Sequence, residues 1–451
     1  MEGDTAEVGV LCHLTSLPGS GEHGTLGEHA FAFVDRLADA GVTVWQVLPL
    51  NPPDEHSSPY ASHSAFASWN ELRDPAVHDV PDDGMFEHWI SANEDWSHDW
   101  AMFSVLRSKH DDAPWTEWPV PLRDRHIGAL RSFEERYASE IRQAIIGQAS
   151  FQRDWDVLRR YASARGVRLF GDVPIFIAHD SADVWANRSL FQLDDQGMPC
   201  VVAGVPPDSF SEDGQRWGTV LYDWDAHRRD QWMWWRHRMA HMCHLFDIVR
   251  IDHFRGIEAA WAIPPECDTA VGGAWQDGPG DDLVREICEV AGPERIVAED
   301  LGIIPPSVIE MRRRHGLPGM AVLQFGFDDD SPLNPHHPTN LTQDQVVYTG
   351  THDNDTTMGW WSGATDEQRA RLSDFIHEGE TPNEALIRIA IASPSSLAII
   401  PLQDIIGTGT ESRMNHPGTV HGNWRWRFEW DVLSSDVWAR FAGLVQQRFD
   451  E

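Results

Sequence analysis

Short, continuous runs of apolar residues recur along the chain, and polar or amphipathic stretches separate them. Eight runs rich in Val, Ile, Leu or Phe are too continuous for half-exposed strands, which would alternate apolar and polar residues. They cover residues 8–14, 42–50, 167–177, 246–252, 295–300, 320–327, 346–353 and 396–404. Between them, amphipathic stretches such as 30–41, 150–166 and 282–292 predict helices. Strand alternating with helix eight times predicts an α/β fold, a (β/α)8 TIM barrel.

The apolar runs are unevenly spaced, and the extra length predicts insertions between barrel strands. We assign residues 1–50 and 165–451 to the barrel, and residues 51–164 to an inserted, mainly helical subdomain. Residues 178–245 predict a second elaboration of the barrel. The glycine-rich segment 272–280 lacks the GK[ST] of a phosphate loop, so we expect a mobile loop there.

Acidic residues end several of the runs, and three of these acids are candidates for catalysis. The segments FDIVRIDHFRG, RIVAEDLG and VVYTGTHDNDT place Asp252, Glu299 and Asp353 at or just beyond the ends of expected strands. Barrel enzymes carry their catalytic residues at the carboxyl ends of the strands. Three such acids together predict an enzyme that uses acid and base chemistry.

Arg250 and Asp252 are two residues apart, so on a strand their side chains share one face. The arginine favours the charged form of the aspartate, which suits a nucleophile, although a structural ion pair at a strand end has the same pattern. Glu299 and Asp300 point to opposite faces, so only one of them faces Asp252. The alternative is that Asp300 caps a helix and Glu299 is merely solvated.

His352 and Asp353 close the seventh run. Taken alone, a His-Asp pair is as typical of a turn as of a site.

The acids Asp252 and Glu299 suggest a specific chemistry. Two carboxyl groups that share a pocket separate in pKa, and one stays protonated near neutrality. Cleavage of a glycosidic bond needs such a pair, one acid for the leaving oxygen and one carboxylate to attack or to activate water.

Charge excludes several classes of partner. Asp and Glu number 71 against 35 Lys and Arg, and the formal net charge is -36. We therefore exclude nucleic acid and anionic membrane surfaces as partners. Acid spread along the whole chain favours a high-salt cytoplasm, where screening weakens self-repulsion, and hence a halophilic archaeal source. An ordinary acidic cytosolic protein is the alternative.

Other compositional signals are negative. The five cysteines include no CxxC pair, so we expect neither a disulfide framework nor a zinc site. The 23 histidines include no HExxH spacing, and we predict no metal and no cofactor. Without a basic, apolar leader or a run of about 18 apolar residues, the sequence predicts a cytoplasmic protein. We expect a monomer or a weak homo-oligomer.

Several longer segments resemble one enzyme family. The chain is similar to amylomaltases, the 4-α-glucanotransferases or disproportionating enzymes related to α-amylases. The similarity covers nearly the whole chain and is least evident from about 71 to 150. It lies in GDVPIFIAHDSADVWANRSLFQLD, VVAGVPPDSFSEDGQRWG, LFDIVRIDHFRG, VAEDLG, YTGTHDNDTT and RMNHPGTVHGNWRWR, and in the N-terminal LTSLPG, VWQVLPL and SSPYASHSAFA.

The resemblance implies transfer of α-1,4-glucan segments between maltodextrins by a retaining double displacement. Asp252 would be the nucleophile, Glu299 the general acid and base, and Asp353 the residue that binds and distorts the sugar. The two carboxyl groups of a retaining pair are expected about 5 to 5.5 Å apart. The implied substrate-binding residues are Tyr60, Asp172, Asp208, Phe210, Glu212, Trp217, Arg250, His352 and Asn415.

One position departs from the family's pattern. The family's lid loop usually reads PPDYF, whereas this chain has Ser209 between Asp208 and Phe210. The change puts in doubt how well the loop excludes water, and with it the ratio of transfer to hydrolysis. An α-glucan hydrolase of the same fold and a catalytically silent glucan-binding protein are the two alternatives.

Overall fold

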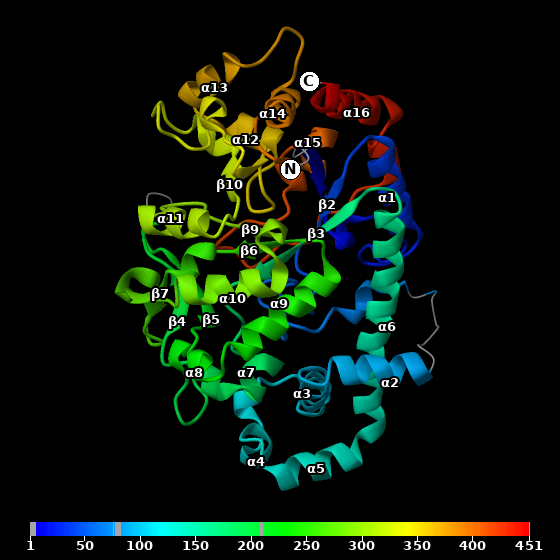
Figure 1. Cartoon of the computed structure of the whole chain (residues 1–451), viewed down its shortest axis with the longest axis vertical. Coiled ribbons are helices and arrows are strands. Elements are labelled where there is room, and N and C mark those ends of the chain that lie inside the picture. Colours follow the sequence, from blue (N-terminus) through cyan, green and yellow to red (C-terminus); the bar gives the residue numbers. More distant parts are fainter. Residues whose placement is uncertain (1–5, 75, 77–82, 208–210, 451) are drawn as a thin grey trace.

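The computed structural model describes residues 6–74, 76, 83–207 and 211–450, which form a parallel barrel with surrounding helices and two elaborations (Figure 1). Hydrogen-bonded neighbours follow the order β10, β11, β12, β1, β2, β3, β6, β9. The strands are β1 (Glu7–Leu11), β2 (Val44–Gln46), β3 (Arg168–Pro174), β6 (Ile248–Asp252), β9 (Ile296–Ala298), β10 (Gly319–Val322), β11 (Gln345–Tyr348) and β12 (Leu397–Pro401). Each overlaps one of the eight apolar runs, so the predicted barrel is confirmed.

The two end strands of this order, β9 and β10, nearly close the barrel. The Ala298 amide donates to the Pro318 carbonyl (2.9 Å), and the Met320 amide donates to Asp300 Oδ1 (2.8 Å). Asp300 also pairs with the buried Arg312 at 3.0 Å. Asp300 therefore joins two strands of the barrel, and the alternative that it caps a helix is wrong.

The strands are continuously apolar because both of their faces are buried. One cluster fills the barrel and takes a side chain from every strand, whereas the alternate residues pack against the outer helices. In β6, Ile248 belongs to the inner cluster and Val249 and Ile251 to the outer one. Since strand side chains alternate, Arg250 and Asp252 continue the inward face of Ile248 toward the carboxyl end.

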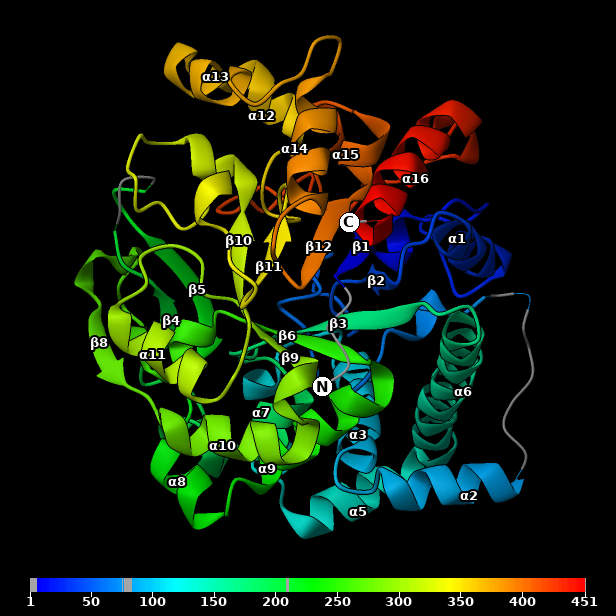
Figure 2. The same cartoon turned by 45° about the horizontal axis from the view of Figure 1, so that its top comes forward.

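Helices cover the outside of the barrel and much of the rest of the chain (Figures 1 and 2). Around the barrel lie α1 (Glu28–Asp39), α9 (Met233–Leu245), α10 (Asp281–Ala291), α11 (Pro306–Arg314), α12 (Thr357–Gly363), α13 (Asp366–Ser373), α14 (Pro382–Ile391), α15 (Leu402–Ile406) and α16 (Ser435–Asp450). In α10 the buried residues Leu283, Val284, Ile287 and Ala291 form one stripe, as the amphipathic pattern predicted.

The insertion between β2 and β3 is largely helical. It contains α2 (Asp83–Ala92), α3 (Ser97–Lys109), α4 (Val120–Arg123), α5 (Ile127–Arg136) and α6 (Ala138–Ser163). The long helix α6 returns to the barrel, where the Tyr161 hydroxyl donates to Asp35 of α1 (2.8 Å) and the Trp155 indole donates to the Leu245 carbonyl (2.8 Å). The division into two domains at 51–164 stays a prediction.

The second elaboration holds a sheet that the sequence pattern did not reveal. Besides α7 (Ala182–Ala186) and α8 (Trp224–Arg229) it includes β4 (Val202–Val205) and β5 (Gln215–Val220). With β7 (Ala259–Ile263) and β8 (Ala274–Asp277) they form an antiparallel sheet in the order β5, β4, β7, β8. The prediction of a mobile loop at 272–280 is therefore wrong for Ala274–Asp277, which form β8. Its sequence AWQD is mostly exposed and has no apolar run, so only pairing with β7 makes it a strand.

No helix in the described part of the chain is both long enough and apolar enough to cross a membrane.

Candidate active site

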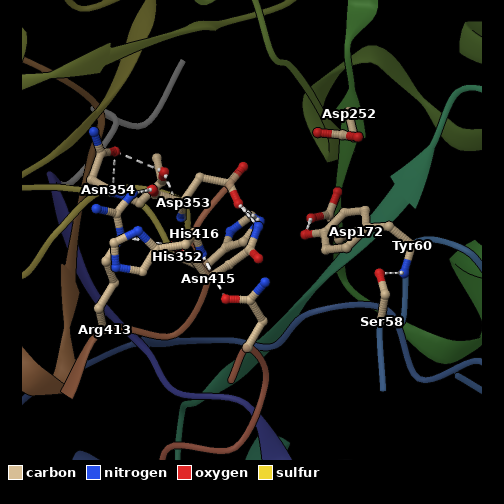
Figure 3. A network of polar contacts seen from close by, with 12 residues as sticks. Ser58, Tyr60, Asp172, Asp252, His352, Asp353, Asn354, Arg413, Asn415 and His416 are labelled. Carbon is tan, nitrogen blue, oxygen red and sulfur yellow. Dashed lines mark hydrogen bonds and ion pairs between the residues drawn. The ribbon is translucent and has the colours of Figure 1, made fainter. Parts of the chain in front are cut away.

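Polar side chains gather at the carboxyl ends of the barrel strands (Figure 3). Asp172 lies in β3 and Asp252 ends β6, while Glu299 directly follows β9. Across from them, His352 and Asp353 follow β11, and Asn415 lies beyond α15. The barrel register therefore brings together residues that are up to about 240 positions apart in the sequence.

Arg250 joins two carboxylates on neighbouring strands. Asp172 and Arg250 are paired across β3 and β6, and Arg250 Nη1 donates to Asp172 Oδ2 at 2.5 Å. Arg250 Nη2 donates to Asp252 Oδ1 at 2.6 Å. The side chain of Asp172 is 0% exposed and that of Asp252 27%. Asp252 is thus the carboxylate of the pair that a bound molecule can reach.

Close packing supports this arrangement at Gly171, the residue before Asp172. A Cβ atom there would lie 2.2 Å from the ring of Phe246, which covers the strand. Burial raises the pKa of Asp172, and the Arg250 charge opposes that rise. The hydrogen bonds of Arg250 to both carboxyl groups hold its guanidinium beside Asp252.

Glu299 lies beside Asp252 and is built to titrate near neutrality. Its amide donates to the Ile251 carbonyl (3.1 Å), which places the residue next to the end of β6. Burial raises the pKa of Glu299 to about 7, and the Asp252 charge adds to the rise against the opposing Arg250 charge. Two amides hold the carboxyl group in place, that of His253 to Oε2 (2.6 Å) and that of Leu301 to Oε1 (2.9 Å).

His253 makes one of these two bonds because of its unusual backbone. Its φ is +56°, in the left-handed region, and its ring packs edge-on against Trp217, with 4.8 Å between ring centroids. Burial lowers the pKa of His253 to about 4, so its ring is neutral at pH 7. Sequence reasoning assigned no role to His253. The only signal was its position directly after Asp252.

The opposite side of the site is held by hydrogen bonds among loop residues, and no buried arginine among the described residues joins two carboxylates there. Asn415 Nδ2 donates to Asp353 Oδ1 (2.6 Å), and His352 Nε2 lies 3.4 Å from the same oxygen. The Asn415 amide also donates to the His352 carbonyl (3.1 Å), while Arg413 donates to the Asp353 carbonyl (2.6 Å). The Asp353 side chain is 43% exposed. Its carboxylate is therefore oriented but open to solvent.

Tyr60 connects the two sides. Its hydroxyl donates to Asp172 Oδ2 (2.7 Å), and its ring stacks on His352 with centroids 5.2 Å apart and planes 10° from parallel. Trp424 packs against both rings. One side chain thus sets the separation between the Asp172–Arg250–Asp252 group and the His352–Asp353–Asn415 group.

Asp404 supports the loop that carries His352 and Asp353, and sequence reasoning missed it. It is 1% exposed and accepts hydrogen bonds from the Thr349 hydroxyl (2.5 Å) and the Thr357 amide (2.7 Å). These two bonds fasten both ends of the segment 349–357. A signal was present, because Asp404 is the acid that ends the eighth apolar run.

Two of the remaining expected residues, Trp217 and Glu212, lie on or near β5. Trp217 is 38% exposed and rests on His253, whereas Glu212 is exposed in the turn before the strand. Asp208 and Phe210 lie outside the described residues, as does Ser209. Among the residues that the structure describes, no group of three or more His, Cys, Asp or Glu is arranged to hold a metal ion.

Comparisons with known proteins agree with this geometry. Residues 12–72 and 71–433 match the family described as 4-alpha-glucanotransferase. The chain is 42% identical to the 4-alpha-glucanotransferase of Thermus thermophilus, over 97% of this chain and 98% of that one. It is 41% identical to the chloroplastic/amyloplastic 4-alpha-glucanotransferase of Solanum tuberosum, over 94% of this chain and 82% of that one.

Solved structures extend the likeness to three dimensions. An amylomaltase from Streptococcus agalactiae, solved in complex with acarbose, matches with a TM-score of 0.94 at 32% identity, over 98% of this chain and 99% of that one. An amylomaltase from Corynebacterium glutamicum shares the fold, with a TM-score of 0.77 at 14% identity, over 98% of this chain and 75% of that one. The similarity therefore includes the barrel and its insertions.

Proposed function

Because the chain belongs to the 4-alpha-glucanotransferase family, glycoside hydrolase family 77, we propose that it moves α-1,4-glucan segments between maltodextrins by double displacement. Asp252 is the nucleophile and Glu299 the general acid and base. The observation that carries this assignment is a pair of neighbouring carboxyl groups in unlike surroundings. Asp252 is paired with Arg250 and reachable, whereas Glu299 is buried with a pKa of about 7.

In the first step Asp252 attacks the anomeric carbon of the donor glucan. The bond from that carbon to the departing oxygen breaks, and the proton of Glu299 goes to that oxygen. A covalent glycosyl ester on Asp252 and a carboxylate on Glu299 result. Because burial raises the pKa of Glu299 to about 7, the proton that this step needs is still available near neutral pH.

In the second step a sugar hydroxyl of the acceptor replaces the first fragment. Esterification removes the charge of Asp252, and with it one of the causes that raise the Glu299 pKa. Glu299 takes the proton of the acceptor hydroxyl, whose oxygen attacks the anomeric carbon and releases Asp252. Two inversions give net retention, with carboxyl groups about 5 to 5.5 Å apart.

The other predicted residues bind and orient the glucan. Asp353, oriented by Asn415 and His352, binds sugar hydroxyls and distorts the ring at the bond to be broken. Arg250 and Asp172 position the nucleophile, and Tyr60 and Trp217 offer ring faces to glucose units. We assign Asp208, Phe210 and Glu212 to glucan binding as well.

Incubation with maltotriose in molar salt tests this function. A transferase yields glucose and a ladder of oligomers longer than maltotriose, and we expect that result by thin-layer or anion-exchange chromatography. If all products are shorter than maltotriose, the protein is a hydrolase. If no products form, it is a glucan-binding protein. Either result would overturn the proposal.

We also retain two expectations from the sequence, a cytoplasmic location and a monomeric or weakly associated state. Light scattering coupled to size-exclusion chromatography tests the second.

A further inference from the structure

Three buried ionisable side chains lie together beside the end of β3, and the proposed mechanism uses none of them. They are Asp183 of α7, Tyr222 in the stretch before α8 and Arg238 of α9, and each is at most 5% exposed. Arg238 Nη1 donates to the Tyr222 hydroxyl (3.5 Å). Burial lowers the pKa of Arg238, while Tyr222 and Asp183 oppose that fall, so the three side chains act on one another.

Asp183 holds the segment that carries Tyr60. The Ala65 amide, five residues after Tyr60, donates to Asp183 Oδ2 at 2.7 Å. Next to Asp183 in the chain, the Ala182 amide donates to the His63 carbonyl at 2.9 Å. The residues of α7 therefore fix the backbone of this segment at two neighbouring points.

Arg238 and Tyr222 hold the backbone beside the nucleophile. Arg238 Nη2 donates to the Pro174 carbonyl (2.7 Å), and the Tyr222 hydroxyl donates to the Ile175 carbonyl (2.7 Å). Pro174 is the register partner of Asp252, and the Ile175 amide donates to the Asp252 carbonyl (3.3 Å). These two side chains therefore fix the end of β3 where it adjoins Asp252.

Charge connects the two parts of the cluster. Burial raises the pKa of Asp183 to about 6, and the Ala65 amide and the Arg238 charge oppose that rise, so Asp183 is a carboxylate at pH 7. The guanidinium of Arg238 lies over the rings of Trp234 (5.3 Å) and Trp235 (5.2 Å). A buried cation that loses its anion is strongly destabilised. Loss of the Asp183 charge therefore disturbs Arg238 as well.

Tyr60 is the residue through which this support reaches the active site. Its hydroxyl donates to Asp172 at 2.7 Å, and its ring stacks on His352 (Figure 3). Because Tyr60 contacts one residue from each side of the site, a shift of its backbone changes both contacts. Misplacement of a binding group by about 1 Å can slow an enzyme about a hundredfold.

We propose that Asp183 is a positioning residue for the reaction, which together with Arg238 holds the Tyr60 ring in register with the end of β3 and with Asp252. This role rests on the proposed function, in which Tyr60 offers its ring to a glucose unit and Asp252 attacks the anomeric carbon. Asp183 touches neither the glucan nor the reacting atoms, so its effect on the rate passes through Tyr60.

A double-mutant cycle between Asp183→Ala and Tyr60→Ala tests this role, with kcat/KM for the consumption of maltotriose as the measurement. We expect Asp183→Ala to lower kcat/KM about fivefold when Tyr60 is present. In the Tyr60→Ala background the loss should be less than about 1.5-fold, because the side chain that Asp183 positions is gone. The same loss in both backgrounds would overturn the inference.

Asp183→Asn is a second variant, which decides the question even if Asp183→Ala does not fold. It keeps an acceptor oxygen for the Ala65 amide and removes the charge that acts on Arg238. We expect kcat/KM to fall about threefold, again only when Tyr60 is present. No loss, or an equal loss in the Tyr60→Ala background, would overturn the inference.

Asp154→Ala is the matched control. Asp154 of α6 has a side chain that is 13% exposed, and it pairs with Arg73 (2.7 Å) and Arg153 (2.6 Å). Its loss should lower the melting temperature and leave kcat/KM nearly unchanged. Asp183→Ala should lower the melting temperature equally with and without the Tyr60 side chain, which separates stability from positioning. An equal fall of kcat/KM in Asp154→Ala and Asp183→Ala would overturn the inference.

The products formed from maltotriose separate the two proposals. If longer oligomers form and the effects of the two substitutions multiply, the transferase function stands and the positioning role fails. If no longer oligomers form, the transferase function fails, and the same cycle is measured on the affinity for maltoheptaose in an Asp252→Asn background by calorimetry. Weaker binding in Asp183→Ala that requires the Tyr60 side chain supports the positioning role, and weaker binding without it overturns the role.

Discussion

The two sides of the site are built differently. Asp172, Arg250 and Asp252 lie on barrel strands, and one buried guanidinium connects them. His352, Asp353 and Asn415 lie on loops, where hydrogen bonds from Asn415 and Arg413 hold them and Asp404 fastens the segment from behind. The difference matches their proposed tasks. A nucleophile needs a fixed charge and position. A residue that binds a sugar ring while the ring distorts needs an oriented side chain on a segment that can shift.

Removing the nucleophile should have the largest effect on the strand side. In Asp252→Asn we expect kcat to fall by about four orders of magnitude or more, because covalent catalysis is lost. Initial rates on maltotriose measure it, and calorimetry should show that glucan binding persists. Activity within about tenfold of the unchanged protein would refute the role of Asp252.

Breaking the buried ion pair comes next. Arg250→Met leaves Asp172 and Asp252 without their shared cation, and we expect a loss of about 3 to 5 kcal/mol in the free energy of unfolding. Urea denaturation in molar salt measures it. Arg159→Met is the control, since Arg159 pairs with Asp247 near the surface at 2.6 Å and should cost about 1 kcal/mol or less. If both variants lose the same free energy of unfolding, the buried pairs of Arg250 stabilise the protein no more than a surface ion pair does.

The pH profile tests the protonation state of Glu299. Its pKa is raised to about 7 in the folded protein, so the acid form dominates below pH 7 and is lost above it. We expect kcat/KM for maltotriose to fall about tenfold per pH unit on the alkaline side. A profile that stays flat to pH 9 would show that the general acid is another group.

On the loop side, Asp404→Asn should weaken catalysis without removing a group that touches the glucan. Loss of acceptor capacity for Thr349 and Thr357 loosens the segment of Asp353, and we expect kcat to fall about tenfold. Asp300→Asn is the matched control, a buried acid that joins β9 to β10 instead. It should lower the melting temperature and leave kcat nearly unchanged. Equal kcat values in the two variants would contradict the positioning role of Asp404.

The connection between the two sides should give the smallest change. Tyr60→Phe keeps the stack on His352 and removes the hydrogen bond to Asp172, a loss of about 0.5 to 1.5 kcal/mol. We expect kcat/KM to fall several-fold in Tyr60→Phe. In Tyr60→Ala, which also removes the stack on His352, kcat/KM should fall further. If kcat/KM is the same in both variants, the Tyr60 ring does not set the separation between the two sides of the site.

The barrel was predictable because its strands are buried on both faces, which makes the apolar runs continuous and easy to recognise. The antiparallel sheet was not predictable, since β5 is only partly buried and β8 is mostly exposed, and both owe their conformation to pairing with β4 and β7. Among the candidate residues, Asp252, Glu299 and Asp353 were found from their place at strand ends. Asp404 was overlooked although it ends the eighth run in the same way.

By itself, the sequence determined the order of strands and helices and the residue types at the strand ends, because these depend on local patterns of burial. Only the tertiary structure decided how those residues act. The pKa of Glu299 depends on burial and on the charges of Asp252 and Arg250, and the stack of Tyr60 on His352 joins residues 292 positions apart. Electrostatic and packing effects of this kind arise from distances in space, which no local sequence pattern contains.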